Sequence, residues 1–360
     1  MEKRLIELYE RLVNTDTGFD IDYSTKLART SFVVDELRKL GFSAHQEEAA
    51  HVAILGEPPY ITLIGHLDTV FKEGESSKRP FKVVDSIAYG PGVADMKGGI
   101  IVLLKVAEEA VKSGVKNLCI IMNVDEELGS KASRKTFYAY AEKSLCCLSF
   151  EPGGENGSLI LTRKGIVPTN LYVKGIKGHA ARLHEGANAI LEAARKIDQI
   201  YSLNGKFGSV TLNPTLINGG EKSNITPDSC KVYFDIRYLE RNDFEKCKLA
   251  LEKICSETTV PGTSCQIEFE ESRPSMTLHP KMKEAVEKVL NKLGINVEFE
   301  HSSGGADSAF FSQANVPTLD GLGICGGKFH SEQEFALLDT FEPRVKIALE
   351  LIRYFSEVKE

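Results

Sequence analysis

Residues 60–68 have the sequence YITLIGHLD, in which an apolar strand runs directly into a histidine and an aspartate. Side chains alternate along an extended chain, so His66 and Asp68 point to the same side. A carboxylate beside a histidine can accept its second N–H and leave the other ring nitrogen for a metal. The same pair also occurs in surface turns without function, so the motif needs support from elsewhere in the chain.

Two more apolar strands end in carboxylates. The predicted strand 118–124 precedes the acidic run DEE at 125–127, and the predicted strand 145–150 precedes Glu151. In open α/β sheets, ligands bind outside the carboxyl ends of the strands. A solvated charge run at a helix start is the alternative for the acidic triplet. A bound cation would instead make the clustered carboxylates favourable.

Two glycine-rich segments supply further donors. Asp95 lies within GPGVADMKGG at 90–99, and His330 follows the glycine-rich run 321–327. Asp95 alone is equally compatible with a helix N-cap after a turn. Taken together, two histidines and several carboxylates form a donor set that suits zinc, with cobalt or manganese as substitutes. Two metals that share a carboxylate form a hydrolytic site.

Strands alternate with helices before residue 151 and again after Pro274. This pattern predicts an α/β catalytic domain with a mixed, largely parallel sheet and flanking helices, formed by 1–163 and 276–360. The intervening residues 164–275 follow the order β-α-β-β-α-β of a ferredoxin-like α+β domain. The elements predicted from apolar periodicity include helices at 3–13, 24–40, 96–113, 130–143, 187–201, 242–257, 280–293 and 342–358, with strands between them. Ser24 is the expected N-cap of the second helix.

Composition excludes several classes of protein. The chain has 360 residues, with 44 Lys and Arg against 51 Asp and Glu, a net charge of −7 that gives no support to a nucleic-acid binder. No apolar run reaches the roughly 18–20 residues of a membrane span, and the first residues lack the apolar core of a signal peptide. The eight cysteines form no Cys-x-x-Cys motif. We therefore expect a cytoplasmic protein without nucleic-acid or membrane partners.

The motifs, taken in order, resemble the zinc metallopeptidase family of glutamate carboxypeptidases, acetylornithine deacetylases, succinyl-diaminopimelate desuccinylases and aminoacylases. The resemblance covers nearly the whole chain: the His-x-Asp strand end, the glycine-rich Asp loop, the Glu-Glu pair, the Glu-Pro-Gly strand end, the insert and a final histidine. It implies a catalytic α/β domain interrupted by a dimerisation domain, a homodimer, and two zinc ions per subunit.

The resemblance also implies roles for individual residues. The ligands of one zinc would be His66, Asp95 and Glu151, and those of the other would be Asp95, Glu127 and His330. Asp95 would bridge the two ions, and its peptide bond to Met96 is expected to be cis. Glu126 resembles the general base, and Asp68 resembles the partner that orients His66.

The insert carries a second set of residues implied by the resemblance. His179 resembles a histidine that reaches the partner subunit's site and stabilises the carbonyl oxygen, and Asn224 and Arg237 resemble contacts to a substrate carboxylate. An arginine offers a carboxylate a bidentate fork. Gly304 resembles part of a loop beside the substrate, and Arg273 is a further candidate carboxylate contact. A loop-capping role for His179 and a surface role for Arg237 remain alternatives.

The expected reaction is hydrolysis of an amide bond next to a free carboxylate. In the family that the chain resembles, a Glu at the position of Glu151 accompanies carboxypeptidases and N-acyl-amino-acid deacylases, so we expect a small peptide or an N-acyl amino acid as substrate. Three alternatives remain: a di- or tripeptidase of the aminopeptidase type, a catalytically silent binding or assembly protein, and a metal-dependent phosphoesterase. The phosphoesterase would need more cationic groups than these motifs offer.

Overall fold

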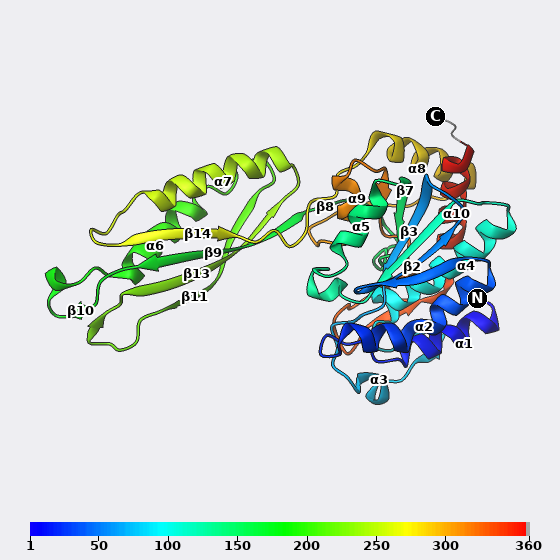
Figure 1. The fold of residues 1–360 in the computed structure, drawn as a ribbon, viewed down its shortest axis with the longest axis horizontal. Coiled ribbons are helices and arrows are strands. Elements are labelled where there is room, and N and C mark those ends of the chain that lie inside the picture. The colour runs from blue at the N-terminus through cyan, green and yellow to red at the C-terminus, as the bar shows by residue number, and fades with distance from the viewer. Residues whose placement is uncertain (358–360) are drawn as a thin grey trace. The chain divides into compact units, whose positions relative to one another are not determined.

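The chain forms two compact units in the computed structural model, which describes residues 1–357 (Figure 1). The first unit comprises Met1–Arg163, Met276–Ser302 and the chain from Ala306 onward. The second unit comprises Lys164–Ser275 and the short segment Ser303–Gly305. The sequence predicts these last three residues to belong to the catalytic domain. They group with the insert instead, where the backbone oxygen of Ser303 accepts a hydrogen bond from Arg237.

A six-stranded sheet forms the centre of the first unit, in the order β1-β2-β6-β3-β7-β16. Strands β6, β3, β7 and β16 are parallel to one another, whereas β2 pairs antiparallel with both β1 and β6. The fold is therefore the mixed, largely parallel α/β sheet that the sequence predicts. The strand bounds are β1 Ser43–Glu47, β2 Ala50–Leu55, β3 Tyr60–His66, β6 Leu118–Asn123, β7 Ser144–Ser149 and β16 Thr318–Leu319.

Helices cover both faces of this sheet, because its central strands are apolar on both sides. Leu63 and Ile120 belong to the large core that includes α1, α2, α4, α8 and α10, whereas Ile64 and Ile121 pack with Phe137 of α5 and with α9. The helix bounds are α1 Lys3–Val13, α2 Tyr23–Lys39, α4 Gly99–Lys112, α5 Arg134–Ala141, α8 Pro280–Leu293, α9 Ser308–Gln313 and α10 Phe341–Glu357, with the short α3 at Glu75–Lys78.

Two small sheets complete the first unit. One has the order β17-β18-β5-β4, and in the other β8 pairs in parallel with β15. The bounds are β4 Lys82–Val84, β5 Ile87–Tyr89, β8 Leu159–Arg163, β15 Phe299–Ser302, β17 Cys325–Gly327 and β18 Phe335–Leu337. The three-residue strands of the first sheet were not predicted from the sequence, yet β5 and β18 position two loops of the candidate site.

The second unit is a four-stranded antiparallel sheet in the order β11-β13-β9-β14, with α6 and α7 packed on one face. This is the predicted ferredoxin-like arrangement, with the additional two-stranded ribbon β10-β12. The bounds are β9 Gly165–Lys174, β10 Gly178–His179, α6 Ala189–Tyr201, β11 Thr211–Gly219, β12 Ile225–Thr226, β13 Ser229–Tyr238, α7 Arg241–Ser256 and β14 Ser264–Phe269.

Several predicted bounds were wrong by a few residues. We expected Ser24 to cap the second helix, but Asp22 is the N-cap and accepts a hydrogen bond from the backbone N–H of Thr25. The helix expected from Met96 begins as α4 at Gly99, because the preceding residues form an irregular turn. Within residues 1–357, no helix is both long and apolar enough to cross a bilayer.

Candidate active site and metal centre

The predicted ligands His66 and Glu151 lie at one edge of the six-stranded sheet. β3 runs parallel to both β6 and β7, so the carboxyl ends of these three strands point the same way. His66 ends β3 and pairs with Asn123, which ends β6. Glu151 follows the end of β7 directly after Phe150. Strand register thus gathers residues from three strand ends, as open α/β sheets do around ligands.

A glycine-rich loop between β5 and α4 carries Asp95. The chain turns at Gly90 and Gly92, whose φ angles are +148° and +70°. A Cβ on Gly92 would lie 2.5 Å from the methyl carbon of Thr69, so both the backbone conformation and the space favour glycine. The peptide bond between Asp95 and Met96 is cis, as the resemblance led us to expect.

Asp95 contacts both predicted histidines through different oxygens. Its Oδ1 lies 3.2 Å from Nε2 of His66, and its Oδ2 lies 3.2 Å from Nε2 of His330. Glu151 Oε1 lies 3.7 Å from His66 Nε2, and Glu127 Oε1 lies 3.5 Å from His330 Nε2. The five predicted ligands therefore form two clusters that share Asp95, each with its donor atoms within 4.8 Å of one another.

The donor chemistry of these clusters fits divalent cations. Each cluster offers one imidazole nitrogen and two carboxylates, which is a ligand set that zinc accepts and that cobalt and manganese share. His66 is 2% exposed and Glu151 is 8% exposed. Buried carboxylates at this density repel one another unless positive charge lies between them, so the residues present suit two cations.

The crowding of ionisable groups shifts their pKa values. Burial, with Asp95 and Glu126 adding to it, raises the pKa of Glu151 well above its usual value despite the opposing charge of His66. Burial works against protonation of His66, but Glu151 and the neighbouring aspartates outweigh it and raise the pKa of His66. Hydrogen bonds to Asp95 and Glu127 raise the pKa of His330 to about 10. Metal ligands must lose their protons, so cation binding here is coupled to proton release.

Asp68 holds two segments of the site together. Nδ1 of His66 donates to the backbone oxygen of Asp68 at 3.0 Å and lies 3.4 Å from its carboxylate, which leaves Nε2 facing the cluster. The same carboxylate accepts hydrogen bonds from the backbone N–H groups of Glu126 and Glu127, at 3.2 and 3.1 Å. Asp68 is fully buried, so it fixes both the histidine ring and the acidic turn.

Glu126 lies beside the two clusters and remains partly exposed. One of its carboxylate oxygens is within 4.8 Å of donor atoms of His66 and Glu127. Unlike the buried Glu151, it can exchange protons with solvent. A carboxylate in this position can accept a proton from water and donate it to a leaving group.

Two buried groups behind the site, Lys26 and Glu334, were not predicted from the sequence. Lys26 is fully buried on α2, and its Nζ donates to the backbone oxygen of Val124, directly before the acidic turn. Glu334 is 1% exposed and accepts hydrogen bonds from the Asp95 loop. A lysine on the apolar face of an amphipathic helix was the available signal for Lys26. Glu334 stands in a polar run that gave no such signal.

The remaining predicted residues belong to the second unit. His179 and Asn224 are exposed and come together at the β10-β12 ribbon, where Asn224 accepts a hydrogen bond from the backbone N–H of Ala180. Nδ1 of His179 accepts one from the backbone N–H of Ala181 at 3.2 Å. This is the loop-capping contact that the sequence analysis weighed as an alternative for His179, and it leaves Nε2 of the ring available.

Arg237 is held by its own strand. Its Nε and one terminal nitrogen bind both carboxylate oxygens of Asp235 at 2.6 and 2.7 Å, and the other terminal nitrogen donates to the oxygen of Ser303 at 3.2 Å. Gly304 lies in the loop that Arg237 holds, and the side chain of the buried Arg273 packs against the next residue of that loop, Gly305. The fork that a substrate carboxylate would use is therefore shared with Asp235.

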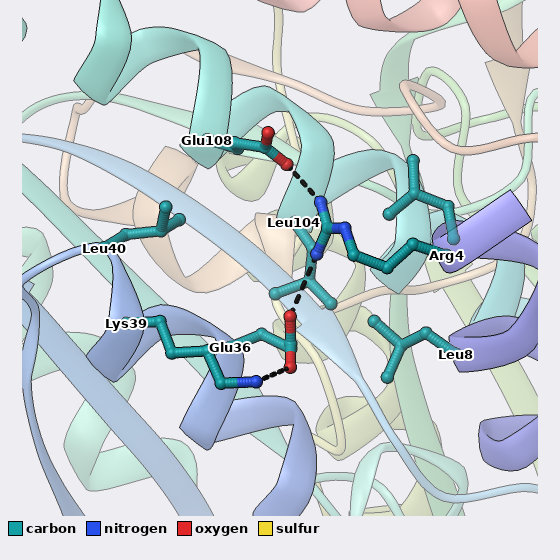
Figure 2. A pocket seen from close by; sticks show the side chains of 8 residues that line it. Arg4, Leu8, Glu36, Lys39, Leu40, Leu104 and Glu108 are labelled. Atoms are coloured by element: carbon teal, nitrogen blue, oxygen red, sulfur yellow. Dashed lines mark hydrogen bonds and ion pairs between the residues drawn. The ribbon is translucent and has the colours of Figure 1, made fainter. Parts of the chain in front are cut away.

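A pocket of about 200 Å³ lies away from these strand ends, among α1, α2 and α4 (Figure 2). Its charged side chains already pair with one another. Arg4 binds Glu36 at 2.9 Å and also Glu108, and Lys39 binds Glu36. The pocket is thus a cross-linked surface between helices and offers no unpaired charge to a ligand.

The fold and the two-histidine, carboxylate-rich clusters are typical of a metal-dependent hydrolase. Residues 62–354 match the model of "Peptidase family M20/M25/M40". The chain therefore belongs to this family of metallopeptidases.

Individual relatives agree with this assignment. Carboxypeptidase G2 of Pseudomonas sp. (strain RS-16) is 30% identical over 370 residues, which cover 97% of this chain and 88% of the relative. The aminopeptidase PepT of Bacillus cereus ATCC 10987 has a similar structure, with a TM-score of 0.80 at 18% identity over 99% of both chains. The YXEP protein of Bacillus subtilis, a dinuclear metal-binding peptidase of family M20, has a TM-score of 0.73 at 14% identity over 99% of this chain and 98% of its own. The two structural likenesses show the fold.

Proposed function

We propose that the protein is a dinuclear zinc-dependent hydrolase of an amide or peptide bond next to a free carboxylate, either a carboxypeptidase or an N-acyl-amino-acid deacylase. The observation that carries the proposal is the position of Asp95, whose two oxygens each lie 3.2 Å from a different histidine. His66 and Glu151 complete one metal site, and Glu127 and His330 complete the other. Cobalt and manganese are possible substitutes for zinc.

When bound, the two cations would polarise the scissile carbonyl and make water more acidic. The residues of the chain orient the ligands and transfer the proton. Asp68 holds the His66 ring so that Nε2 faces the cluster, and it fixes the acidic turn through two backbone N–H groups. Glu126 accepts a proton from the attacking water and donates it to the departing nitrogen, as a general base and then a general acid. Lys26 places a buried ammonium group behind this turn.

Substrate recognition is assigned to the second unit. Asn224, Arg237 and Arg273, with the loop at Gly304, are the proposed contacts to the free carboxylate of the substrate. Arg237 supports this role with a guanidinium that is 28% exposed, although Asp235 occupies part of its fork. A substrate carboxylate would therefore have to displace Asp235 or bind the remaining donor.

We also assign dimer formation to the second unit. β11 forms one edge of the four-stranded sheet, and its residues Leu216 and Ile217 are 61% and 52% exposed. An apolar, unpaired edge strand is a template for pairing with another chain. In such a homodimer His179 would act in the partner subunit's site and donate to the oxygen that becomes negative in the transition state.

The carboxypeptidase or deacylase assignment is preferred to an aminopeptidase-type di- or tripeptidase. The relative that is 30% identical over nearly the whole chain is a carboxypeptidase, whereas the likeness to the aminopeptidase PepT is one of fold at 18% identity. The Glu at position 151 also favours a carboxypeptidase or deacylase.

Comparison of three substrates tests the proposal on zinc-loaded enzyme. The first is an N-acyl amino acid, the second is the same compound with its carboxylate converted to an amide, and the third is a dipeptide with a free amine. We expect turnover of the first and loss of turnover when the carboxylate is blocked. Preference for the free-amine dipeptide would favour the di- or tripeptidase. A fully metal-loaded protein that hydrolyses none of a broad set of peptides and N-acyl amino acids would favour the silent binding protein.

A further inference from the structure

Glu334 makes an unusual set of contacts for a carboxylate. It is 1% exposed, and its Oε1 accepts hydrogen bonds from the backbone N–H groups of Ala94 and Asp95 at 2.9 and 3.0 Å. Its Oε2 accepts a third from the N–H of Gly92 at 3.1 Å. One buried side chain thus accepts hydrogen bonds from three backbone amides of the loop that carries Asp95.

These contacts select one conformation of that loop. Gly90 and Gly92 have positive φ angles, and glycine gives a free loop many other conformations. The three amides converge on one carboxylate only in the observed conformation. A buried carboxylate without these donors is strongly destabilised, because it has lost its contacts with water and gained none in return. Glu334 therefore raises the free energy of other conformations of the loop. One of the amides belongs to Asp95 itself, so the contact acts directly on the backbone of the shared ligand.

Glu334 also belongs to the segment that carries His330. Glu334 immediately precedes β18, which pairs with β5, the strand that leads into the Asp95 loop. Between His330 and Glu334 the chain makes a tight turn, in which the N–H of Glu334 donates to the oxygen of Ser331 at 3.3 Å. His330 itself has a φ of +61°. The side chain of Glu334 therefore links two segments that are far apart in the sequence, and each of them carries a proposed ligand.

We infer that Glu334 is a positioning residue that fixes Asp95 and holds it in register with His330. The inference rests on the proposed function, because it takes both residues as metal ligands. It also predicts which of the two metal sites is more sensitive to the loss of Glu334. Two ligands of the Asp95, Glu127 and His330 cluster lie on the linked segments, against one in the cluster with His66 and Glu151. Loss of the link therefore weakens the His330 site more than the His66 site.

The test is a titration of metal-free protein with Co²⁺, followed by the visible absorption of the bound ion and by competition with a chelator. Glu334→Gln keeps the size of the side chain but replaces one acceptor oxygen with an NH₂ group that cannot accept from Gly92. We expect the cobalt affinity of the His330 site to fall about 10- to 100-fold, the usual effect of removing a group that orients a ligand, and that of the His66 site to fall less. The absorption spectrum of the His330 site should change as well.

Glu332→Gln is the matched control, because Glu332 is an exposed residue of the same turn and the substitution removes the same charge. We expect it to bind both cobalt ions as the wild type does. Glu334→Asp is the second variant, in case the glutamine variant does not fold. It keeps the carboxylate but withdraws it by one methylene, and it should also weaken the more sensitive site.

Thermal unfolding of the metal-free variants separates positioning from general stability. A merely structural role would lower the unfolding temperature and leave both cobalt affinities and spectra unchanged in the folded protein, and that result would overturn the inference. If the wild type binds two cobalt ions and both Glu334 variants match it, only the inference fails. If the wild type itself binds fewer than two, the proposed dinuclear function fails.

Discussion

His51 should make the first unit sensitive to acid, although it takes no part in the reaction. It lies on β2, is 1% exposed, and its Nε2 is 3.1 Å from the hydroxyl of Thr30. Burial lowers its pKa to about 4. The folded protein therefore keeps His51 neutral at a pH where the unfolded chain, with a histidine pKa of about 6.5, already binds a proton. The free energy of unfolding must fall as the pH drops from about 6.5 towards 4.

The size of this effect follows from the two pKa values of His51. Their difference, about 2.5 units at about 1.4 kcal/mol per unit, gives a total loss of about 3.5 kcal/mol, of which about 3 kcal/mol is lost by the time the pH reaches the folded value. Between pH 7 and pH 5 the unfolded chain takes up most of its proton while the folded protein takes up little. Over that interval the loss is about 2 kcal/mol.

Urea unfolding of the wild type and of His51→Gln at a series of pH values measures this contribution. The variant cannot be protonated, so it should lose about 2 kcal/mol less than the wild type between pH 7 and pH 5. Other titrating groups contribute equally to both proteins and cancel in the difference. Parallel pH profiles for the wild type and His51→Gln would refute the reasoning.

Three further predictions concern the site. Glu126→Gln should retain both metals and lower the turnover rate on the order of 10²-fold or more, and near-full turnover would remove Glu126 as the base. His66→Ala and His330→Ala should each lower the metal content measured by elemental analysis, because each removes the only imidazole of one cluster; full occupancy in either variant would exclude that histidine as a ligand. His179→Ala should keep its metals but lose activity corresponding to about 3–4 kcal/mol. Mixed dimers of His179→Ala and Glu126→Gln chains should regain activity, whereas continued inactivity after confirmed subunit exchange would place His179 within its own chain's site or in a structural role.

The clustering of His66, Glu127 and Glu151 could be predicted because these residues lie at or just after the ends of β3, β6 and β7, whereas the roles of Asp95 and His330, which lie in loops, were implied by the family resemblance. An apolar strand followed by His66 or Glu151 reveals both the buried element and the polar residue at its edge. Parallel neighbours then bring such residues together, whatever their separation along the chain. The contact of Asp68 with the backbone of the acidic turn could not be predicted in this way, since it depends on the exact register between β3 and β6.

Glu334 illustrates what sequence patterns do not reveal. It stands in the polar run KFHSEQE at 328–334, which reads as an exposed loop. Its buried carboxylate is satisfied by three backbone amides of a loop more than two hundred residues earlier in the chain. Such donors cannot be recognised from the sequence, because nearly every residue has a backbone N–H. The strands that bring the two loops together, β5 and β18, have three residues each and are too short for a periodic signal.

The N-cap of α2 is a second feature that the sequence alone does not decide. Asp22 and Ser24 are both favoured N-cap residues, and they stand two positions apart. The choice between them depends on which oxygen reaches an unpaired backbone N–H. In the structure the Asp22 carboxylate accepts from Thr25 and also from the hydroxyl of Ser24, so the residue that we expected to cap the helix supports the cap instead.

The account depends most on Asp95 as the carboxylate shared by two metals, and metal stoichiometry tests this directly. Zinc would be measured by elemental analysis after dialysis against a limiting zinc buffer, for the wild type and for Asp95→Ala, with Asp85→Ala as a control in the preceding β4–β5 turn. The account predicts two zinc ions per chain in the wild type and in the control, and loss at both sites in Asp95→Ala. An Asp95→Ala protein that still binds two zinc ions per chain with unchanged affinity would contradict it.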